Sequence, residues 1–299
     1  MRFVRVFWIS LLGAVLSTGV VGQVSDPNIA QYGVGKAHRY TQTGPSTVTA
    51  TSYAFNAFVD ATANGVINAA KLYGPLNSYL DANGPQDLTV RGDNSGADFT
   101  VTGYVDTNDL NAAFPNDSSG NYRLRIDTGS AGGSIGGTYD HEIQFNLGGD
   151  AYPATIPLLT IDNGAWNSGT YMVGAPDAVT HFGWNFSDYN STTDVVVFSI
   201  RANNDGTEIA RVQFQGSNPG GYTLAADALL AGVDYTGELF FARIVDNPSD
   251  ISGVQGVAYY SVETTFAIQA VPEPSTYVLM GVGALMIWWW RRRAARPRA

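Results

Sequence analysis

The sequence has no cysteine in 299 residues and only three histidines. The missing thiols exclude a disulfide scaffold, a thiolate metal site and a cysteine nucleophile. No two histidines have a metal-ligand spacing such as H-E-x-x-H, and in a strand His141 would point away from Asp140 and Glu142. Core burial alone must therefore hold the body together, which its 44% hydrophobic content allows.

Positive charge is scarce between the two ends of the chain. Of 16 basic residues, seven lie within the first five or the last nine residues. Residues 23–290 hold the other nine and all 26 acidic residues, a net charge of −17. This charge argues against nucleic-acid partners and anionic membrane surfaces, and an acidic surface keeps an exported protein soluble.

The N-terminus has the three parts of a secretory signal peptide. Residues 1–5 carry two arginines, residues 6–16 are apolar, and residues 20–22 offer a cleavage position. We expect the Sec translocon to export the body and signal peptidase to remove residues 1–22. An N-terminal membrane anchor is the alternative, and it gives the body the same topology.

The last 29 residues hold three signals in a fixed order. Pro272 and Pro274 exclude a helix interior, so the first segment is extended. Residues 277–290 are uncharged and would form a transmembrane helix of about 21 Å, short against a hydrocarbon core of about 30 Å. The tryptophans at the end of this segment suit the headgroup level of the membrane, and the arginines that follow keep the C-terminal end of the helix on the cytoplasmic side. The predicted sorting residues are Val271, Pro272, Glu273, Pro274, Ser275 and Thr276, and the membrane stop is Trp288, Trp289, Trp290, Arg291, Arg292 and Arg293.

This tail, residues 271–299, resembles the PEP-CTERM sorting signal of Gram-negative bacteria. The likeness lies in Val271 to Thr276, in the apolar helix with Gly281 and Gly283, and in the arginine cluster. The resemblance implies recognition by an exosortase, a membrane-embedded cysteine transpeptidase-like enzyme. It further implies a transient stay in the inner membrane and export to the cell surface or extracellular matrix, often alongside exopolysaccharide.

Period-two alternation dominates the body, which predicts an all-β fold. Residues 122–126, 141–147, 212–214 and 258–268 alternate, whereas residues 195–198 read as a strand buried on both faces. Turn clusters separate these runs and favour antiparallel β-sandwiches. One helical stretch is expected over residues 66–80, interrupted by Pro75.

A leucine, a glycine and then a tyrosine entering an alternating strand occur twice, at Tyr122 and at Tyr235. The pattern resembles the tyrosine corner of immunoglobulin-like and fibronectin type III sandwiches. We predict a linker over residues 23–37 and two sandwich modules over residues 38–150 and 151–270. A single larger sandwich is the alternative.

Candidate ligand and catalytic residues are few. Residues 132–136 spell G-x-S-x-G, but inside a glycine-rich loop rather than a strand–helix elbow. Two oxygen-rich loops resemble calcium sites, although Lys71 stands where the first needs its bidentate acid. No other cofactor is expected. The calcium candidates are Asp60, Asn64, Asn68, Asp93 and Asp98, and the candidates for sugar stacking are Trp166 and Trp184, which core packing would also explain.

Three functions remain open. The first is a non-catalytic structural or adhesive protein of the surface or biofilm matrix, with no catalytic residue assigned. The second is an exopolysaccharide-binding module, which predicts that Trp166 or Trp184 is exposed. The third is a secreted hydrolase, which predicts a cleft with two acids about 5 to 9.5 Å apart.

Overall fold

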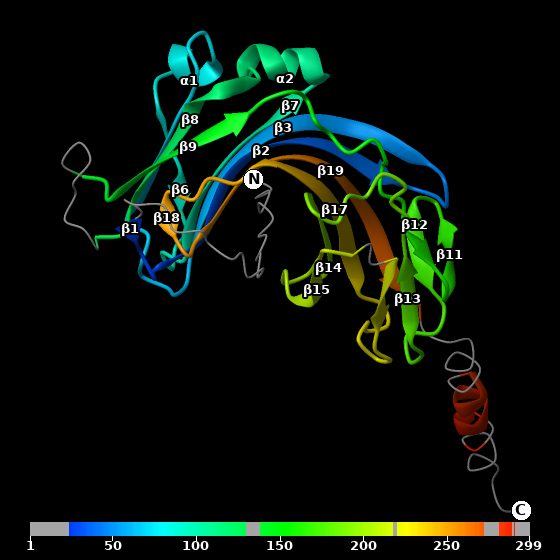
Figure 1. The fold of residues 1–299 in the computed structure, drawn as a ribbon. Helices are drawn as coiled ribbons and strands as arrows, with labels where there is room; N and C mark the ends of the chain where they lie inside the picture. The colour runs from blue at the N-terminus through cyan, green and yellow to red at the C-terminus, as the bar shows by residue number, and fades with distance from the viewer. Residues whose placement is uncertain (1–23, 130–137, 218–219, 272–280, 289, 291–299) are drawn as a thin grey trace, which may run out of the picture.

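The computed structural model describes residues 24–129, 138–217, 220–271, 281–288 and 290. Its body is built mainly of strands, so the all-β expectation is confirmed (Figure 1). The largest sheet has ten strands, with β15, β14, β17, β19, β2, β3, β7 and β6 side by side in that order and β12 and β11 continuing from β19. Their bounds are β2 Ile29–Gln42, β3 Val48–Ala61, β6 Thr89–Val90, β7 Gly96–Tyr104, β11 Gly164–Asn167, β12 Thr170–Val173, β14 Asp194–Ala202, β15 Glu208–Gln215, β17 Asp234–Asp246 and β19 Gln255–Ala270.

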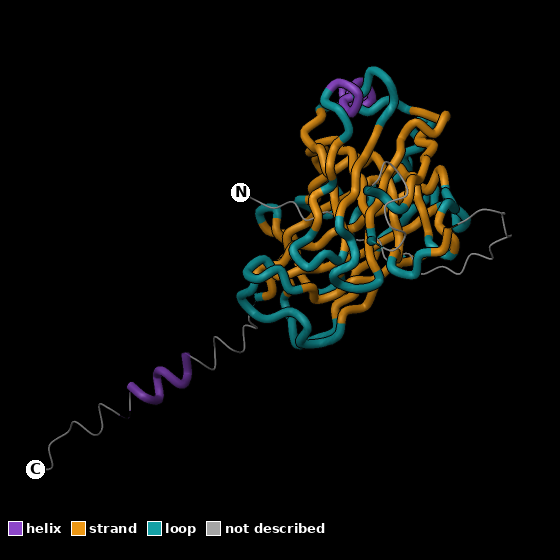
Figure 2. The backbone as a smooth tube through the Cα atoms, turned by 90° about the vertical axis from the view of Figure 1, so that its left-hand side faces the viewer, coloured by secondary structure: helices purple, strands orange, loops and turns teal. Residues whose placement is uncertain are grey.

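Smaller sheets and two short helices complete the body. Helices α1 and α2 lie together at one end (Figure 2), capped by the side chains of Ser78 and Asp106. A four-stranded sheet runs β5-β4-β8-β9, a three-stranded sheet runs β10-β13-β16, and β1 pairs with β18. The bounds are α1 Tyr79–Ala82, α2 Thr107–Ala113, β1 Val24–Ser25, β4 Ala69–Tyr73, β5 Gln86–Asp87, β8 Asp117–Asp127, β9 His141–Leu147, β10 Thr160–Ile161, β13 Thr180–Gly183, β16 Gly221–Leu224 and β18 Ile251–Ser252.

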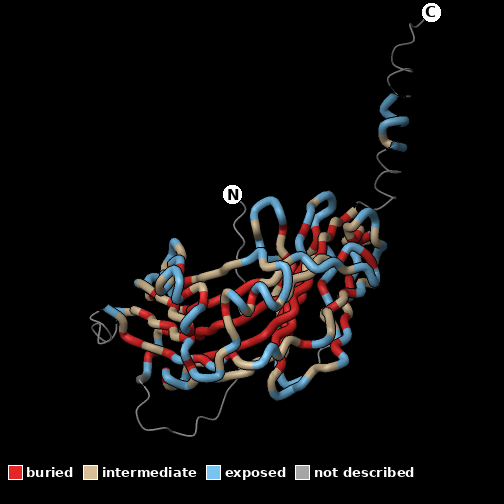
Figure 3. Tube along the Cα trace, turned by 90° about the horizontal axis from the view of Figure 1, so that it is seen from above, coloured by how far each residue is buried: buried red, intermediate tan, exposed pale blue. Residues whose placement is uncertain are grey.

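One face of the large sheet carries two separate cores. The four-stranded sheet covers the first core, and the three-stranded sheet covers the second. Strand β19 contributes to both, with Tyr260 in the first and Phe266 and Ile268 in the second. These side chains share a face because strand side chains alternate with a period of two. Buried residues accordingly run along the central strands, while exposed ones gather in the loops around them (Figure 3).

The opposite face of the large sheet holds a third apolar cluster. Phe58 of β3 and Val197 of β14 both belong to it, although three strands separate β3 from β14. Side chains of β17 and β19 between them connect the cluster, and the sheet that carries it is strongly curved in Figure 1. Gly35 makes room for this packing, because a Cβ there would lie 2.4 Å from the ring of Tyr259.

Several sequence predictions are confirmed, and three need correction. Residues 122–126, 141–147 and 195–198 are strands, the last buried on both faces. The helix expected over residues 66–80 is wrong, because β4 pairs with β8 and buries alternate residues. The linker expected over residues 23–37 is wrong, since most of it forms β1 and β2. The sandwich is not purely antiparallel, because β19 runs parallel to β2 from Gln255–Gln31 to Phe266–Gln42.

The predicted division into two modules has a counterpart in the two cores. The predicted boundary falls between β9 and β10, and each side has its own covering sheet. However, β2 from the first segment and β19 from the second are neighbours in one sheet. The cores are therefore joined by a continuous backbone ladder, and the exact module boundary stays a prediction.

The second tyrosine pattern forms the contact expected of a tyrosine corner. The Leu230 backbone N–H donates to Tyr235 Oη at 2.7 Å, just before β17. In the first pattern, Tyr122 Oη donates to the carbonyl of Pro115 at 2.8 Å. Both buried tyrosines thus fix the chain a few residues upstream of their strand, as the resemblance implied.

Candidate functional site

The sorting segment begins where the large sheet ends. Ala270, the last residue of β19, is paired with Val173 of β12. The next backbone N–H, that of Val271, donates to the Val173 carbonyl at 3.0 Å. Pro272, Glu273, Pro274, Ser275 and Thr276 lie outside the described residues. Val271 is thus the one sorting residue that the structure places, and it is held by a hydrogen bond to the sheet.

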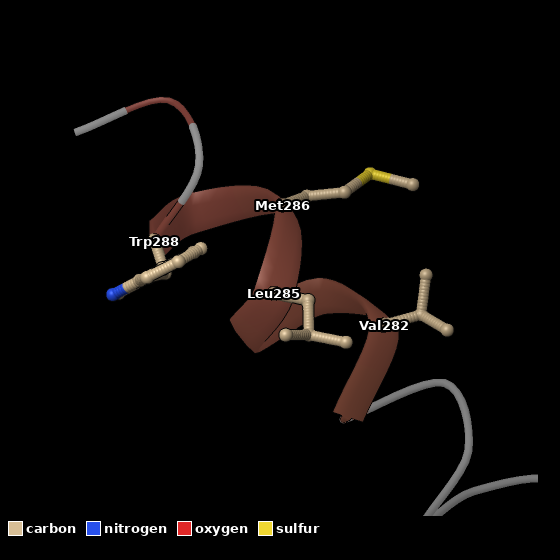
Figure 4. Close-up of a pocket in the computed structure, with 4 residues that line it drawn as sticks. All are labelled: Val282, Leu285, Met286 and Trp288. Atoms are coloured by element: carbon tan, nitrogen blue, oxygen red, sulfur yellow. The ribbon is translucent and has the colours of Figure 1, made fainter. Parts of the chain in front are cut away.

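Residues 281–288 of the predicted transmembrane segment are helical. Val282, Leu285, Met286 and Trp288 project from this helix, and all four are exposed (Figure 4). No helix in the described part of the chain is both long and apolar enough to cross a membrane. Trp290 is 74% exposed. Trp289, Arg291, Arg292, Arg293 and the signal peptide over residues 1–22 lie outside the described residues, so the span and the signal peptide stay predictions.

The two tryptophans proposed for sugar stacking do not form a shared platform. Trp184 is only 5% exposed and packs in the second core against Phe198, with ring centroids 5.2 Å apart. Its assignment as a stacking residue is therefore wrong. Trp166 on β11 is half-buried, with its ring edge-on to Tyr171 at 5.5 Å. Stacking at Trp166 stays a prediction.

Two of the calcium candidates meet, but around a guanidinium group. Arg91 Nη2 lies 2.8 Å from Asp60 Oδ1, and Arg91 Nε lies 3.2 Å from Asp98 Oδ2. Gln31 also donates to Asp60 Oδ2. Burial raises the pKa of Asp60 to about 7 and that of Asp98 to about 6, and Arg91 opposes both shifts.

The other calcium candidates lie in exposed turns. Asn64 and Asn68 flank the connection from β3 to β4, and Asp93 Oδ1 accepts the Ser95 N–H at 3.0 Å. Among the residues that the structure describes, no group of three or more histidine or acidic side chains is arranged to hold a metal ion. The five candidates thus do not converge on one site, and a calcium requirement stays a prediction.

The remaining motif residues have structural partners or are not placed. His141 is buried, with Nε2 at 2.8 Å from Asp26 Oδ2. Glu142 points the other way and pairs with Arg125, as alternation predicts for a strand. Residues 132–136, with the G-x-S-x-G spelling, lie outside the described residues.

One face of the large sheet carries a concentration of charge that no sequence pattern predicted. We call it the charged face; it shares its side of the sheet with Phe58 and Tyr259, and it comprises Arg39, Asp60, Arg91, Asp98, Arg211, Glu238 and Glu263. Within it, Arg39 Nε lies 2.9 Å from Glu263 Oε2. Ser199 of β14 stands between Arg211 and Glu238, paired with each. Charged residues from most strands of the sheet therefore share one surface.

Several buried polar atoms on this side lack a partner. Glu238 is 8% exposed, and its Oε1 has no hydrogen-bond partner in the described part of the chain. Burial, reinforced by the nearby Glu263, raises the pKa of Glu238 well above its usual value. The other such atoms are Asp98 Oδ1, Arg211 Nη2, Gln213 Oε1 and Gln255 Oε1. Titratable groups with shifted pKa values and unsatisfied polar atoms cluster at functional sites, which makes the charged face the candidate site of the body.

The curvature of the sheet brings charged residues of distant strands within electrostatic range of each other. Arg211 lies on β15 near one edge of the sheet and Asp60 lies on β3 toward the other, yet the positive charge of Arg211 lowers the pKa of Asp60. The only clue in the sequence was that Arg211 and Gln213 alternate with apolar residues. Such alternation gives the side of a strand, but it does not tell which strands face each other.

The comparison with protein families places one motif in the chain. Residues 270–293 match the model of the PEP-CTERM protein-sorting motif. The chain therefore carries this motif, which indicates exosortase-dependent export to the cell surface of a Gram-negative bacterium. Comparison with curated proteins gives no match.

Two solved structures, among others, are similar to the body. The FN1–FN3 domains of chicken CNTN1 share 13% identity, covering 81% of this chain and 67% of that one, with a TM-score of 0.21. The chicken interferon gamma receptor alpha chain shares 10% identity, covering 81% of this chain and 98% of that one, with a TM-score of 0.23. At these TM-scores neither likeness bears on function, and the fold rests on the strand order described above.

Proposed function

We propose that this chain, which carries a PEP-CTERM sorting motif, is a non-catalytic structural or adhesive protein of the cell surface or matrix. The observation that carries the proposal is the place of the motif directly after the last strand of the body. A signal peptide at the other end would then put the whole strand-rich body outside, while the arginine tail stays inside. The Sec translocon, signal peptidase, the inner membrane and an exosortase are the partners that this route requires.

Three acids of the charged face are held in ion pairs, which suits a structural role. Asp60, Asp98 and Glu263 each have an arginine partner at 2.8 to 3.2 Å. Such pairs hold these three carboxylates in fixed positions. A surface with both charge signs is suited to engaging a polar matrix component.

A second candidate function is exopolysaccharide binding at the charged face. Arg211, with 17% of its side chain exposed, and the half-buried Gln213 two residues along the same strand offer N–H donors to the oxygens of a sugar. Calorimetric titration of the purified protein with the polysaccharide of its own host tests this function. Binding that is lost in Gln213→Ala supports it, whereas equal binding by that variant contradicts it.

The sorting step is tested by replacing Pro272, Glu273 and Pro274 with alanine. The wild-type and variant chains are expressed with and without a co-expressed exosortase, and cell fractions are compared by immunoblot. We expect the wild type to reach the surface only with exosortase and the variant to stay with the inner membrane in both cases. A variant that reaches the surface in its mature form would contradict the proposal.

The adhesive role needs its own test in the native host. A deletion strain should form a weaker surface-attached matrix, which the wild-type gene restores and the triple-alanine gene does not. Matrix mass by dye binding and cell detachment under flow measure the effect. An unchanged matrix in the deletion strain would refute the adhesive role while leaving the sorting step untouched.

A further inference from the structure

A lysine is buried on the face of the large sheet that carries the two cores. Lys36, in the middle of β2, is completely buried, where an isolated ammonium group is unfavourable. Its Nζ lies 2.6 Å from Asn111 Oδ1 and 2.6 Å from Asn116 Oδ1. The ring of Tyr260 covers it, with the centroid 5.8 Å from Nζ. This amine is thus held against two side-chain amides.

The contact with Asn111 brings an amine close to an amide carbon. A carbonyl bond is about 1.23 Å long, so Asn111 Cγ lies within about 3.8 Å of Lys36 Nζ. Reacting atoms in near-attack geometries lie about 3 to 3.5 Å apart. The upper bound on the Nζ–Cγ distance exceeds that range by only about 0.3 Å, so at most a small shift brings the two groups into it.

A carboxylate holds the other end of the same amide. Asn111 Nδ2 donates to Asp150 Oδ2 at 2.8 Å and to Asp150 Oδ1 at 3.1 Å. The negative charge of Asp150 also acts on Lys36. One carboxylate thus holds the nitrogen that would leave, and its negative charge also acts on the attacking amine.

The surroundings of Lys36 favour its nucleophilic form. Burial lowers the pKa of Lys36 to about 8, although Asp150 opposes the shift. At neutral pH about one molecule in ten then carries the free amine, far more than for an exposed lysine. Lysine amines are nucleophiles when desolvated in this way.

We propose that Lys36 and Asn111 join in an intramolecular isopeptide bond. The lone pair of Nζ attacks Asn111 Cγ, the Cγ–Nδ2 bond breaks, and ammonia leaves. The proton that Nζ loses passes to the departing Nδ2, which Asp150 holds by two hydrogen bonds, and the carboxylate ends unchanged. The amine and the amide become one secondary amide plus ammonia, and no oxidant or reductant takes part.

Asn116 has a separate, positioning role in this arrangement. Its Oδ1 accepts from Lys36 Nζ and also from Tyr260 Oη, at 2.9 Å. No carboxylate contact to the Asn116 amide nitrogen is present among the described residues. Asn116 therefore fixes the direction of Nζ, and Asn111 is the amide that reacts.

The bond would link the central strand β2 to helix α2, 75 residues apart in the chain. Closing a loop of this length restricts the unfolded chain, as a disulfide does. The chain has no cysteine, so it has no disulfide with which to achieve this. The proposal does not depend on how the tail is sorted.

Mass spectrometry of the purified full chain tests the bond directly. We expect an intact mass lower by one ammonia than the covalent formula of the purified form, and one tryptic species joining the Lys36 and Asn111 peptides. A wild-type chain with unchanged mass, or a link from Lys36 to Asn116, would overturn the proposal.

Variants separate the roles of the neighbouring residues. Asn111→Ala should restore the full mass, and Asp150→Asn should leave most molecules unlinked. Asn121→Ala is the matched control and should keep the link, because the Asn121 amide also donates to a carboxylate, that of Asp117, whereas Lys36 Nζ bonds to Asn111 and Asn116. Circular dichroism checks that each variant is folded. A folded Asn111→Ala variant that still lacks ammonia, or a folded Asp150→Asn variant that links fully, contradicts the assignment.

Discussion

Glu238, on the charged face, has a pKa well above the ordinary value of a glutamate. It is buried beside Glu263, and only Glu263 has a direct arginine partner, Arg39. In the unfolded chain, Glu238 releases its proton above its ordinary pKa of about 4.5. In the folded state the raised pKa keeps the proton bound to a higher pH. The resulting stability is present at low pH and is lost as the pH rises toward the folded-state pKa. Asp60 and Asp98 act in the same direction, up to pH values of about 7 and about 6.

The first prediction concerns Glu238→Gln. Glutamine cannot ionise, so the variant should be more stable than the wild type at pH 8, by about 1 to 3 kcal/mol, the penalty of an unsatisfied buried group. At pH 5 the two should differ little, because Glu238 is then largely protonated. The free energy of unfolding in urea at both pH values measures the difference. Burial lowers the pKa of His38 to about 4, which gives the stability the opposite dependence on pH. Because His38 is present in both proteins, its contribution cancels when the variant is compared with the wild type.

Glu208→Gln provides the control for that experiment. Glu208 lies on the neighbouring strand β15, and its side chain is 39% exposed. Its replacement should change stability by no more than about 0.5 kcal/mol at either pH. If Glu238→Gln had the same effect at pH 5 and pH 8, the carboxyl would be titrating normally.

At the scale of a single element, the tyrosine corner fixes the position at which strand β17 begins. Tyr235 is 1% exposed, and its Oη accepts the Leu230 N–H at 2.7 Å. The contact fixes the loop that leads into β17. Because β17 pairs with both β14 and β19, the start of one strand determines the register of three.

The second prediction is therefore that Tyr235→Phe destabilises the body by about 1 to 2 kcal/mol. The ring remains, but the Leu230 N–H loses its partner. The midpoint of chemical unfolding should fall while its slope stays the same. Tyr222→Phe is the matched control, because the Tyr222 hydroxyl makes no hydrogen bond within the described part of the chain and its ring also packs on the second core. Equal losses in the two variants would show that the corner contact is unimportant.

At the scale of the whole molecule, one strand serves both cores. Tyr260 of β19 packs in the first core, and Phe266 of the same strand packs in the second. The parallel pairing of β19 with β2 joins the N-terminal and C-terminal parts of the body. Loss of either core would expose apolar side chains along the strand that they share.

The third prediction is that the body unfolds in one cooperative step and that its N-terminal part does not fold alone. A fragment of residues 24–150 lacks Ala258 and Tyr260, which complete the first core, and it leaves β2 with an unpaired edge. Calorimetry of residues 24–271 should show a single transition. Proton NMR of the 24–150 fragment should show poor signal dispersion. Two transitions, or a well-dispersed fragment, would favour independent modules.

Much of the local structure could be predicted from the sequence. Alternation identified the strands over residues 122–126 and 141–147, because hydrophobic periodicity is a local property. The tyrosine pattern at Tyr235 predicted a specific contact, since both partners lie within six residues. The sorting motif could be predicted for the same reason, as its signals are contiguous.

The failures involve partners distant in the chain. Residues 69–73 became a strand because β8, about 50 residues later, pairs with them. Trp184 became a core residue because Phe198 and Phe214 surround it. The charged face also could not be predicted, because Arg39 meets Glu263 only after β2 and β19 pair.

The sequence alone therefore determined the class of the body, the side on which each strand buries its residues and the sorting signal at its end. Only the tertiary structure decided that one sheet spans both cores, that charged residues from distant strands share a face, and that Lys36 lies against Asn111. The physical reason is that periodicity and short motifs depend on neighbours in the chain, whereas sheet order and curl depend on which distant strands exclude water together.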